Sequence, residues 1–198
     1  MILKIVQVGE PVLRRPARPL SRDEILSPAI QELIAHMRDT MRDAPGVGLA
    51  APQVGIPFQL AVIEDPPEFV SELPADIVTA QDRQAVPFHV LCNPRLYVEE
   101  PAEVTFFEGC LSLSGFTALV PRALAVKVEA LDHRAEPISV RARGWYARIL
   151  QHEIDHLNGW MYVDRMETRS LMSTENHSRY WRGRTVQDVQ TALRIERR

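Results

Sequence analysis

The segment 151–156, with the sequence Gln-His-Glu-Ile-Asp-His, has the residue types and the spacing of a catalytic metal site. His152 and His156 are four residues apart, so on a helix their side chains lie on one face, about one turn apart. Both imidazoles can then reach one metal ion, while Glu153 stands beside the ion without binding it. The H-E-x-x-H pattern on a helix is typical of metal-dependent amide hydrolysis, with the glutamate as general base.

The residues around this motif predict a central, buried helix. Apolar side chains recur at roughly helical spacing, at Trp145, Ile149, Leu150, Ile154 and Leu157. Gly159 follows as a helix stop. Histidines and acids on a buried helix are costly unless they are paired or ligate a metal. A pair of hydrogen-bonded core histidines is the alternative, but it gives no role to Glu153 or Asp155.

Length, charge and hydropathy limit the class of protein. The chain has 198 residues, enough for one domain with a stable core, and a formal net charge of −3, which gives no bulk attraction to nucleic acid. No apolar run approaches the ~20 residues that cross a bilayer, and residues 1–6 read as a first strand rather than a signal peptide. We therefore expect a cytoplasmic protein without a membrane partner, in which Cys92 and Cys110 are free or metal-bound. A homodimer is compatible with the sequence but not indicated by it.

The remaining elements must position the motif. Ser27 and Pro28 mark the start of one helix, and Thr185 followed by Asp188 marks the start of the last. Apolar runs predict strands at 60–63, 90–92, 104–107, 119–120, 125–131 and 138–141. Residues 65–87 are rich in Pro, Asp and Glu and long for a loop, which predicts a surface insertion with a short helix of its own. Without βαβ alternation, we expect an α+β fold, with short, mostly antiparallel strands around the buried helix that carries H-E-x-x-H.

Catalytic zinc-type sites usually have three protein ligands and one open position, so a third ligand is needed. In metzincins a third histidine follows at a fixed distance, but this chain has Tyr162 there. Glu175 in a polar loop is a second candidate. Cys110 is the third: it follows a β-rich run and Gly109, and its thiolate would complete a Cys-His-His site. We favour Cys110, whereas Cys92 lies in an apolar run and is expected in the core.

Three segments together resemble the motifs of the peptide deformylases. Residues 46–53 (GVGLAAPQ) are similar to the family's G-x-G-L-A-A-x-Q, residues 108–112 (EGCLS) to its E-G-C-L-S, and residues 151–156 (QHEIDH) to its Q-H-E-x-D-H. Their order and spacing also fit, and the resemblance covers roughly residues 5–165. The run Ser114-Gly115-Phe116 and the 65–87 insertion most resemble the organellar-type subgroup.

This resemblance implies a reaction, the removal of the formyl group from the N-terminal formylmethionine of newly synthesised polypeptides. It implies one divalent metal ion on Cys110, His152 and His156, with Fe(II) favoured and Zn(II) or another divalent ion as the alternative. The partners would be N-formylmethionyl nascent peptides.

The resemblance also implies catalytic roles. The ion would lower the pKa of a water molecule, and Glu153 would take the water's proton and later return it to the leaving amine. The Gln53 side-chain amide and the Leu111 backbone N–H would stabilise the oxyanion that forms. For Gln53, the alternative is a solvated loop residue.

The expected substrate cleft lies along the first motif. There, two glycines allow a peptide to approach the backbone closely and to lie like an added strand, with its methionine side chain in an apolar pocket. The expected substrate-binding residues are Gly46, Val47, Gly48, Phe106, Gly109, Trp145 and Ile149. Glu108 and Arg122 match a family pair that braces the cysteine loop; the alternative is a surface ion pair worth under ~1 kcal/mol.

The C-terminal part matches the family least well. We expect a catalytic domain over 1–165 and an extension over 166–198, with a terminal helix, in the same domain. Six arginines lie between Arg179 and Arg198 against Asp188 and Glu196. This basic tail is a candidate for docking on ribosomal RNA, through phosphate contacts that weaken with salt. A solvated helix face whose arginines complement the helix dipole is the alternative.

Two other functions stay open at this point. A zinc peptidase that cuts internal peptide bonds would use Glu175, not Cys110, as its third ligand. A non-catalytic peptide-binding module with a structural metal would close its site with four protein ligands and would have no use for Glu153.

Overall fold

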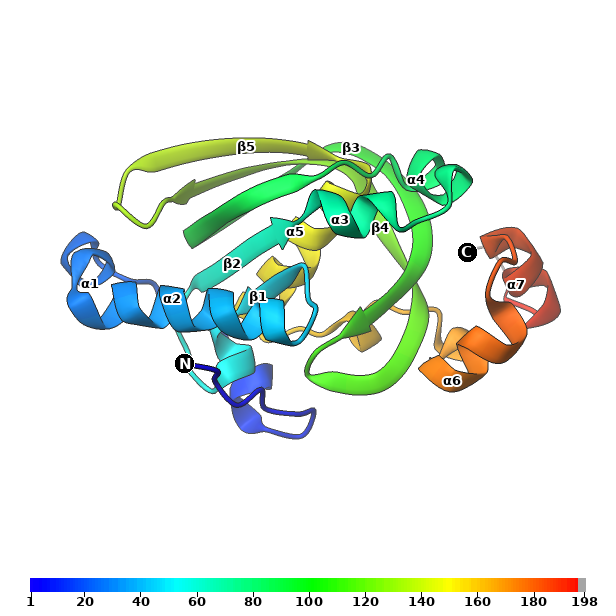
Figure 1. The fold of residues 1–198 in the computed structure, drawn as a ribbon, viewed down its shortest axis with the longest axis horizontal. Coiled ribbons are helices and arrows are strands. Elements are labelled where there is room, and N and C mark those ends of the chain that lie inside the picture. Colours follow the sequence, from blue (N-terminus) through cyan, green and yellow to red (C-terminus); the bar gives the residue numbers. More distant parts are fainter. Residues whose placement is uncertain (196–198) are drawn as a thin grey trace.

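A computed structural model of the chain describes residues 1–195, so predictions that involve Glu196, Arg197 and Arg198 lie outside the described residues (Figure 1). The helices are α1 Arg22–Leu26, α2 Pro28–Asp43, α3 Pro67–Ser71, α4 Ala75–Gln81, α5 Gly144–Leu157, α6 Thr174–Asn176 and α7 Val186–Ala192. The strands are β1 Gly48–Ala50, β2 Leu60–Asp65, β3 Val86–Cys110, β4 Leu113–Leu131, β5 Pro137–Arg143 and β6 Met172–Ser173. The strands and helices form no βαβ series, and the predicted α+β class is confirmed.

The strands form one antiparallel sheet in the order β1-β2-β3-β4-β5, with β6 paired to β4. The prediction of short strands is wrong for β3 and β4, which have 25 and 19 residues and unite several predicted strands. Register shifts near Glu100 interrupt their pairing without ending it. Such irregularities bend a strand, and Figure 1 shows both strands curving from the top of the view to its bottom. The charged and proline-containing stretch 99–103 therefore marks a bend and not a turn.

Helix α5 lies inside the curve of the sheet, where it contacts all of the first five strands (Figure 1). One apolar cluster joins Leu150 and Ile154 of α5 to sheet residues such as Val126 and Val128. A second cluster joins the buried stripe of α2 to β1, β2 and β3. The prediction that the H-E-x-x-H helix is central and buried is confirmed.

Capping residues begin the helices as their sequence indicates. The Ser27 hydroxyl accepts a hydrogen bond from the Ile30 N–H at the start of α2. At the start of α7, Thr185 and Asp188 form a reciprocal capping box. Because such side chains satisfy backbone N–H groups that the helix leaves unpaired, local sequence predicts these starts well.

The N-terminal segment departs from the prediction. Residues 1–6 form no strand; instead, the Val6 N–H donates to the Gln53 carbonyl and the Val8 N–H to the Ser112 carbonyl. These bonds reach two different turns rather than one neighbouring strand, so no ladder forms. No helix within residues 1–195 is long and apolar enough to cross a membrane.

The predicted insertion over 65–87 contains helices of its own, α3 and α4. Its end is held by Arg83, which makes two 2.8 Å hydrogen bonds to the buried Asp65 carboxylate. The end of α4 also packs on the first residue of α5. Gly144 there has φ +60°, and a Cβ atom on it would stand 2.5 Å from the Gln81 carbonyl oxygen. The insertion thus helps to set where the site-bearing helix begins.

Candidate active site

The three predicted metal ligands come together in the structure. Cys110 ends β3, whereas His152 and His156 lie on successive turns of α5. The Cys110 Sγ atom lies 3.2 Å from His156 Nε2, and that nitrogen lies 3.3 Å from His152 Nε2. All three ligand atoms lie within 4.8 Å of one another.

The spacing of these atoms fits a divalent metal ion. Tetrahedral nitrogen and sulfur ligands at ~2.1 and ~2.3 Å from an ion stand roughly 3.4–3.6 Å apart, close to the separations observed. Within residues 1–195, the group has three members, which matches a catalytic site with an open fourth position better than a closed structural site. Glu175, the alternative third ligand, lies in α6 and is not part of the group.

A buried carboxylate orients one of the two histidines. The His152 Nδ1 atom donates to Glu108 Oε2 over 2.9 Å, which leaves Nε2 directed at the candidate metal position. Arg122 also donates to both oxygens of Glu108, at 2.9 and 3.0 Å. Burial opposes ionisation of Glu108, but its bonds to His152 and Arg122 outweigh that effect and hold its pKa below the ordinary value. A carboxylate behind a metal-binding histidine fixes the tautomer and the ring orientation.

This pair is buried, so the alternative of a surface ion pair is wrong: Arg122 is 3% exposed and Glu108 is 5% exposed. The pair belongs to a larger charge network. The Arg148 guanidinium also donates to Glu108, and Arg122 donates to Asp155. Asp155 accepts two further hydrogen bonds from Arg165. A buried charge is costly unless it is paired, so each member depends on the others.

Arg148 and Arg165 lie outside the three sequence motifs, yet both belong to this network. Arg148 stands four residues before His152 on α5, among apolar neighbours, and a lone arginine in such a stripe is a signal that it pairs with a buried acid. Asp155, which was left without a partner, pairs with both Arg122 and Arg165.

Glu153 lies beside the candidate metal position in a buried setting. Its side chain is 4% exposed, and no described residue donates a hydrogen bond to its buried Oε2 atom. Burial raises the pKa of Glu153 to about 7. The carboxylate packs against the backbone of β1, where a Cβ atom on Gly48 would stand 2.6 Å from Glu153 Cδ. Only glycine leaves room for it.

Gln53 is buried and held in one orientation, so the alternative of a solvated loop residue is wrong. It lies in a 3-10 turn, Ala51–Val54, directly after β1. Its Oε1 atom accepts from the Ala50 N–H over 2.8 Å, so its amide NH2 group points the other way. There, Nε2 donates to Cys110 Sγ over 3.5 Å and to Ser112 Oγ over 3.4 Å. The amide donor therefore lies next to the candidate metal position.

A cavity of about 630 Å³ opens beside these groups. Six of the seven predicted substrate-binding residues line it: Gly46, Val47, Gly48, Gly109, Trp145 and Ile149. Gln53, Leu111, His152 and Glu153 also line it. The seventh, Phe106, is not among the lining residues; its ring packs edge-on against Trp145. Its neighbour Phe107 lines the cavity instead, because successive residues of a strand point to opposite faces.

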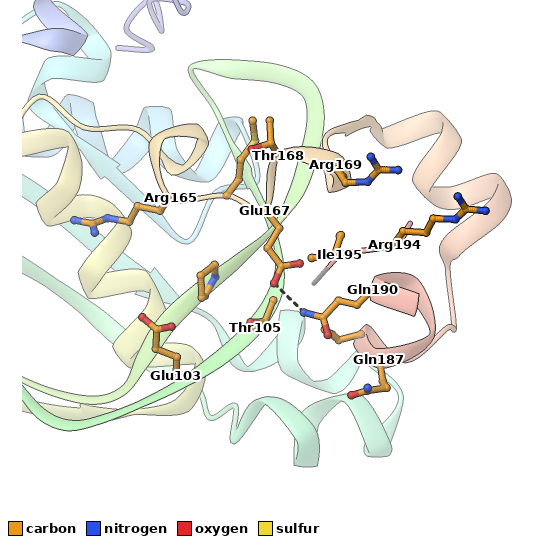
Figure 2. Close-up of a pocket in the computed structure, with 13 residues that line it drawn as sticks. Glu103, Thr105, Arg165, Glu167, Thr168, Arg169, Gln187, Gln190, Arg194 and Ile195 are labelled. Carbon is orange, nitrogen blue, oxygen red and sulfur yellow. Dashed lines mark hydrogen bonds between the residues drawn. The ribbon is translucent and has the colours of Figure 1, made fainter. Parts of the chain in front are cut away.

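A larger cavity, of about 1090 Å³, lies elsewhere and contains none of the predicted site residues (Figure 2). It lies between α7, the segment 165–169 and the β3–β4 pair. Figure 2 shows Gln190 of α7 donating to Glu167 across it. Arg165 is the link between the two regions, because it lines this cavity and also binds Asp155.

Cys92 is separate from the site. It is fully buried in β3, within the apolar cluster that α2 covers, as predicted for a core residue. Burial raises the pKa of its thiol to about 12, so it stays protonated at ordinary pH.

Comparison with known proteins points to one family. The family model of polypeptide deformylase matches residues 2–171. Chloroplastic peptide deformylase 1A of Solanum lycopersicum is 49% identical over 172 residues, which cover 87% of this chain and 62% of that protein. Mitochondrial peptide deformylase of Homo sapiens is 40% identical, over 89% of this chain and 71% of that protein. The chain thus spans less than two thirds of the tomato relative's length.

A solved structure is also similar. The Met-Ala-Ser-bound crystal structure of class I type b peptide deformylase from Acinetobacter baumannii has a TM-score of 0.74 and 33% sequence identity. The similarity covers 84% of this chain and 99% of that one. The peptide deformylase from Thermotoga maritima has a TM-score of 0.68 and 31% identity, over 84% and 98% of the two chains.

Proposed function

Because this chain belongs to the polypeptide deformylase family, we propose that it hydrolyses the formyl group from the N-terminal formylmethionine of newly synthesised polypeptides. The products are formate and a free N-terminal amine. The observation that carries this proposal is the group of Cys110, His152 and His156, of which Cys110 and His152 line a cavity together with the buried Glu153.

We assign the role of metal ligands to Cys110, His152 and His156, for one divalent ion. A thiolate with two imidazoles suits ferrous iron or zinc, and the resemblance to peptide deformylases favours Fe(II). When bound, such an ion would supply Lewis acidity, which would lower the pKa of a water molecule toward neutrality. Glu108 holds His152 for this role through its hydrogen bond to Nδ1.

Glu153 is the proposed general base and general acid. Its Oε2 atom has no hydrogen-bond partner among the described residues, so it is free to accept a proton from water. The same carboxyl group then returns that proton to the leaving nitrogen, which departs as a neutral amine. The close packing of Gly48 against the carboxylate keeps it in place for both transfers.

Gln53 and Leu111 are the proposed oxyanion donors. Attack on the formyl carbon turns the carbonyl oxygen into an oxyanion, which needs donors already in position. The Ala50 N–H holds Gln53 Oε1, so the Nε2 donor faces the cysteine without having to reorient. The backbone N–H of Leu111 follows directly after that cysteine, at the same cavity.

The cavity suits a formylated peptide with an apolar first side chain. Val47, Trp145 and Ile149 offer an apolar wall for methionine, and Gly46 and Gly48 let the peptide backbone approach β1. The Acinetobacter relative binds Met-Ala-Ser, which is what remains of formyl-Met-Ala-Ser once formate has left. That formylated tripeptide is therefore our test substrate.

The test is formate release from formyl-Met-Ala-Ser by freshly purified protein that is handled without oxygen and loaded with Fe(II). We expect stoichiometric formate and Met-Ala-Ser, and no formate when the metal is removed. Acetyl-Met-Ala-Ser serves as the control, because it keeps the peptide but replaces the formyl group. Cleavage of internal peptide bonds without formate would contradict the proposal and favour a peptidase.

We further propose that the extension 166–198 belongs to the same domain as residues 1–165 and docks on the ribosome. Four tail arginines of the described part are exposed: Arg179, Arg182, Arg184 and Arg194. Cosedimentation with bacterial ribosomes at low and moderate salt tests the docking. Replacing Arg179, Arg182 and Arg184 by Gln should abolish cosedimentation. Replacing three exposed arginines elsewhere by Gln should leave cosedimentation unchanged: Arg15, Arg95 and Arg134.

We propose a cytoplasmic enzyme, although relatives include chloroplastic and mitochondrial proteins. We also propose that the chain can form a homodimer, which a measurement of the protein's mass in solution tests.

A further inference from the structure

A segment outside the family match reaches the proposed substrate cavity. The match to the polypeptide deformylase model ends at residue 171. The next residues, Met172–Ser173, form β6, which pairs with Phe116 and Thr117 at the edge of β4. Residues 174–181 continue from that strand as two short helical turns. Figure 1 shows this segment beside the lower bend of β3 and β4.

Two residues of this segment meet the cavity wall. Thr174 itself lines the cavity, and its hydroxyl donates to the Gly115 carbonyl over 3.5 Å. His177 packs edge-on against the ring of Phe107, with 4.4 Å between the ring centroids. Gly115 and Phe107 line the same cavity, so the segment forms part of the wall and supports another part.

This part of the wall is the rim of the cavity. Thr174 is exposed and Phe116 is 44% exposed, whereas Glu153 and His156 at the reacting end are 4% and 0% exposed. If the formyl group lies at the buried end and methionine fills the apolar wall, the rest of the peptide must leave past the exposed rim. We propose that residues 172–177 contact the second and third residues of the substrate peptide and thereby set a preference among nascent chains.

The rim has a chemistry that favours one type of side chain. It presents the aromatic rings of Phe107 and Phe116, and the His177 ring packs against Phe107. Burial together with Arg182 lowers the pKa of the His177 imidazole, so that ring is uncharged at neutral pH. Aromatic faces gain from contact with other aromatic or apolar side chains. A third substrate residue such as phenylalanine should therefore bind better than glycine. This inference rests on the proposed deformylase function.

The first experiment blocks the rim with a large side chain. Steady-state kinetics are measured on formyl-methionine amide, which ends before the rim, and on formyl-Met-Ala-Phe, which reaches it. In Thr174→Trp we expect kcat/KM for the longer peptide to fall by about tenfold, mainly because KM rises. For formyl-methionine amide, kcat/KM should stay within about twofold of wild type.

The control is Thr191→Trp. Thr191 is also an exposed threonine of the C-terminal extension whose hydroxyl donates to a backbone carbonyl, that of Gln187, but it lines neither cavity. This variant should leave both substrates within about twofold of wild type. Equal effects of Thr174→Trp on the short and the long substrate, or no effect on either, would overturn the rim assignment. Failure of the wild type to release formate from either substrate would instead overturn the proposed function.

A second variant removes a contact rather than adding one. His177→Ala takes away the ring that packs on Phe107, so the ratio of kcat/KM for formyl-Met-Ala-Phe to that for formyl-Met-Ala-Gly should fall. His177→Phe keeps an aromatic ring and should restore most of the ratio. A ratio that is the same in wild type and His177→Ala would contradict the proposed preference, whatever the effect on stability.

Discussion

The carboxylate of Glu153 on α5 packs directly against Gly48 in β1, so closely that a Cβ atom on Gly48 would stand 2.6 Å from Glu153 Cδ and nearer still to Oε1. Atoms that are not bonded do not approach so closely. The two residues lie more than a hundred positions apart in the chain, and the pairing of β1 with β2 beside α5 brings them together.

We expect Gly48→Ala to displace the Glu153 carboxylate and to remove most activity while the metal stays bound. Overpacking of this kind costs about 1–3 kcal/mol of unfolding free energy. A double-mutant cycle measured by urea denaturation checks the cause. In a Glu153→Ala background, the added methyl group has room, so the destabilisation by Gly48→Ala should largely vanish. Equal destabilisation in both backgrounds would mean that the methyl group meets something other than Glu153.

Glu153→Gln should keep the fold and the metal but lose turnover by about 10²–10⁴-fold, because an amide cannot accept the proton of water. The substitution keeps the size of the side chain, so the packing against Gly48 is unchanged. The measurements are kcat on formyl-Met-Ala-Ser and metal content on the same sample. Turnover within a factor of a few of wild type would remove Glu153 from the mechanism.

The two cysteines should respond differently to substitution. Cys110→Asp should weaken metal binding or change the preferred metal, since only Cys110 stands beside both histidines. Cys92→Ser should leave metal content unchanged, although a hydroxyl group in the apolar core will lower stability. Metal content is therefore measured on folded protein by elemental analysis. Equal metal loss in both variants would contradict the ligand assignment.

The burial of Cys92 should make stability fall in alkali. The folded chain keeps this thiol protonated up to a pKa of about 12, whereas an unfolded chain releases the proton near pH 9. Between these values the unfolded state binds fewer protons, so the free energy of unfolding falls as pH rises. Between pH 8 and 10.5, the loss in wild type should exceed that in Cys92→Ala by roughly 2 kcal/mol. Urea denaturation at both pH values measures the difference, and equal losses would contradict the buried thiol.

Local sequence predicted those parts of the site that depend on neighbouring residues. His152, Glu153 and His156 share one helix, and helical periodicity alone puts the two imidazoles on one face. The caps of α2 and α7 are likewise interactions over three residues. The same local reasoning failed for residues 1–6, because an apolar run becomes a strand only when a neighbouring strand is there to pair with it.

Only the tertiary structure decided how distant residues meet. Strand pairing across irregular registers placed Glu108 behind His152 and Phe107, not Phe106, at the cavity. The pairing of β6 with β4 also brought Thr174, from beyond the family match, to the rim. The amino-acid sequence by itself determined which side chains can do chemistry, since that follows from residue type and short spacing. Whether these side chains line one cavity depended on packing between residues far apart in the chain. A local sequence pattern contains no information on the free energy of that packing.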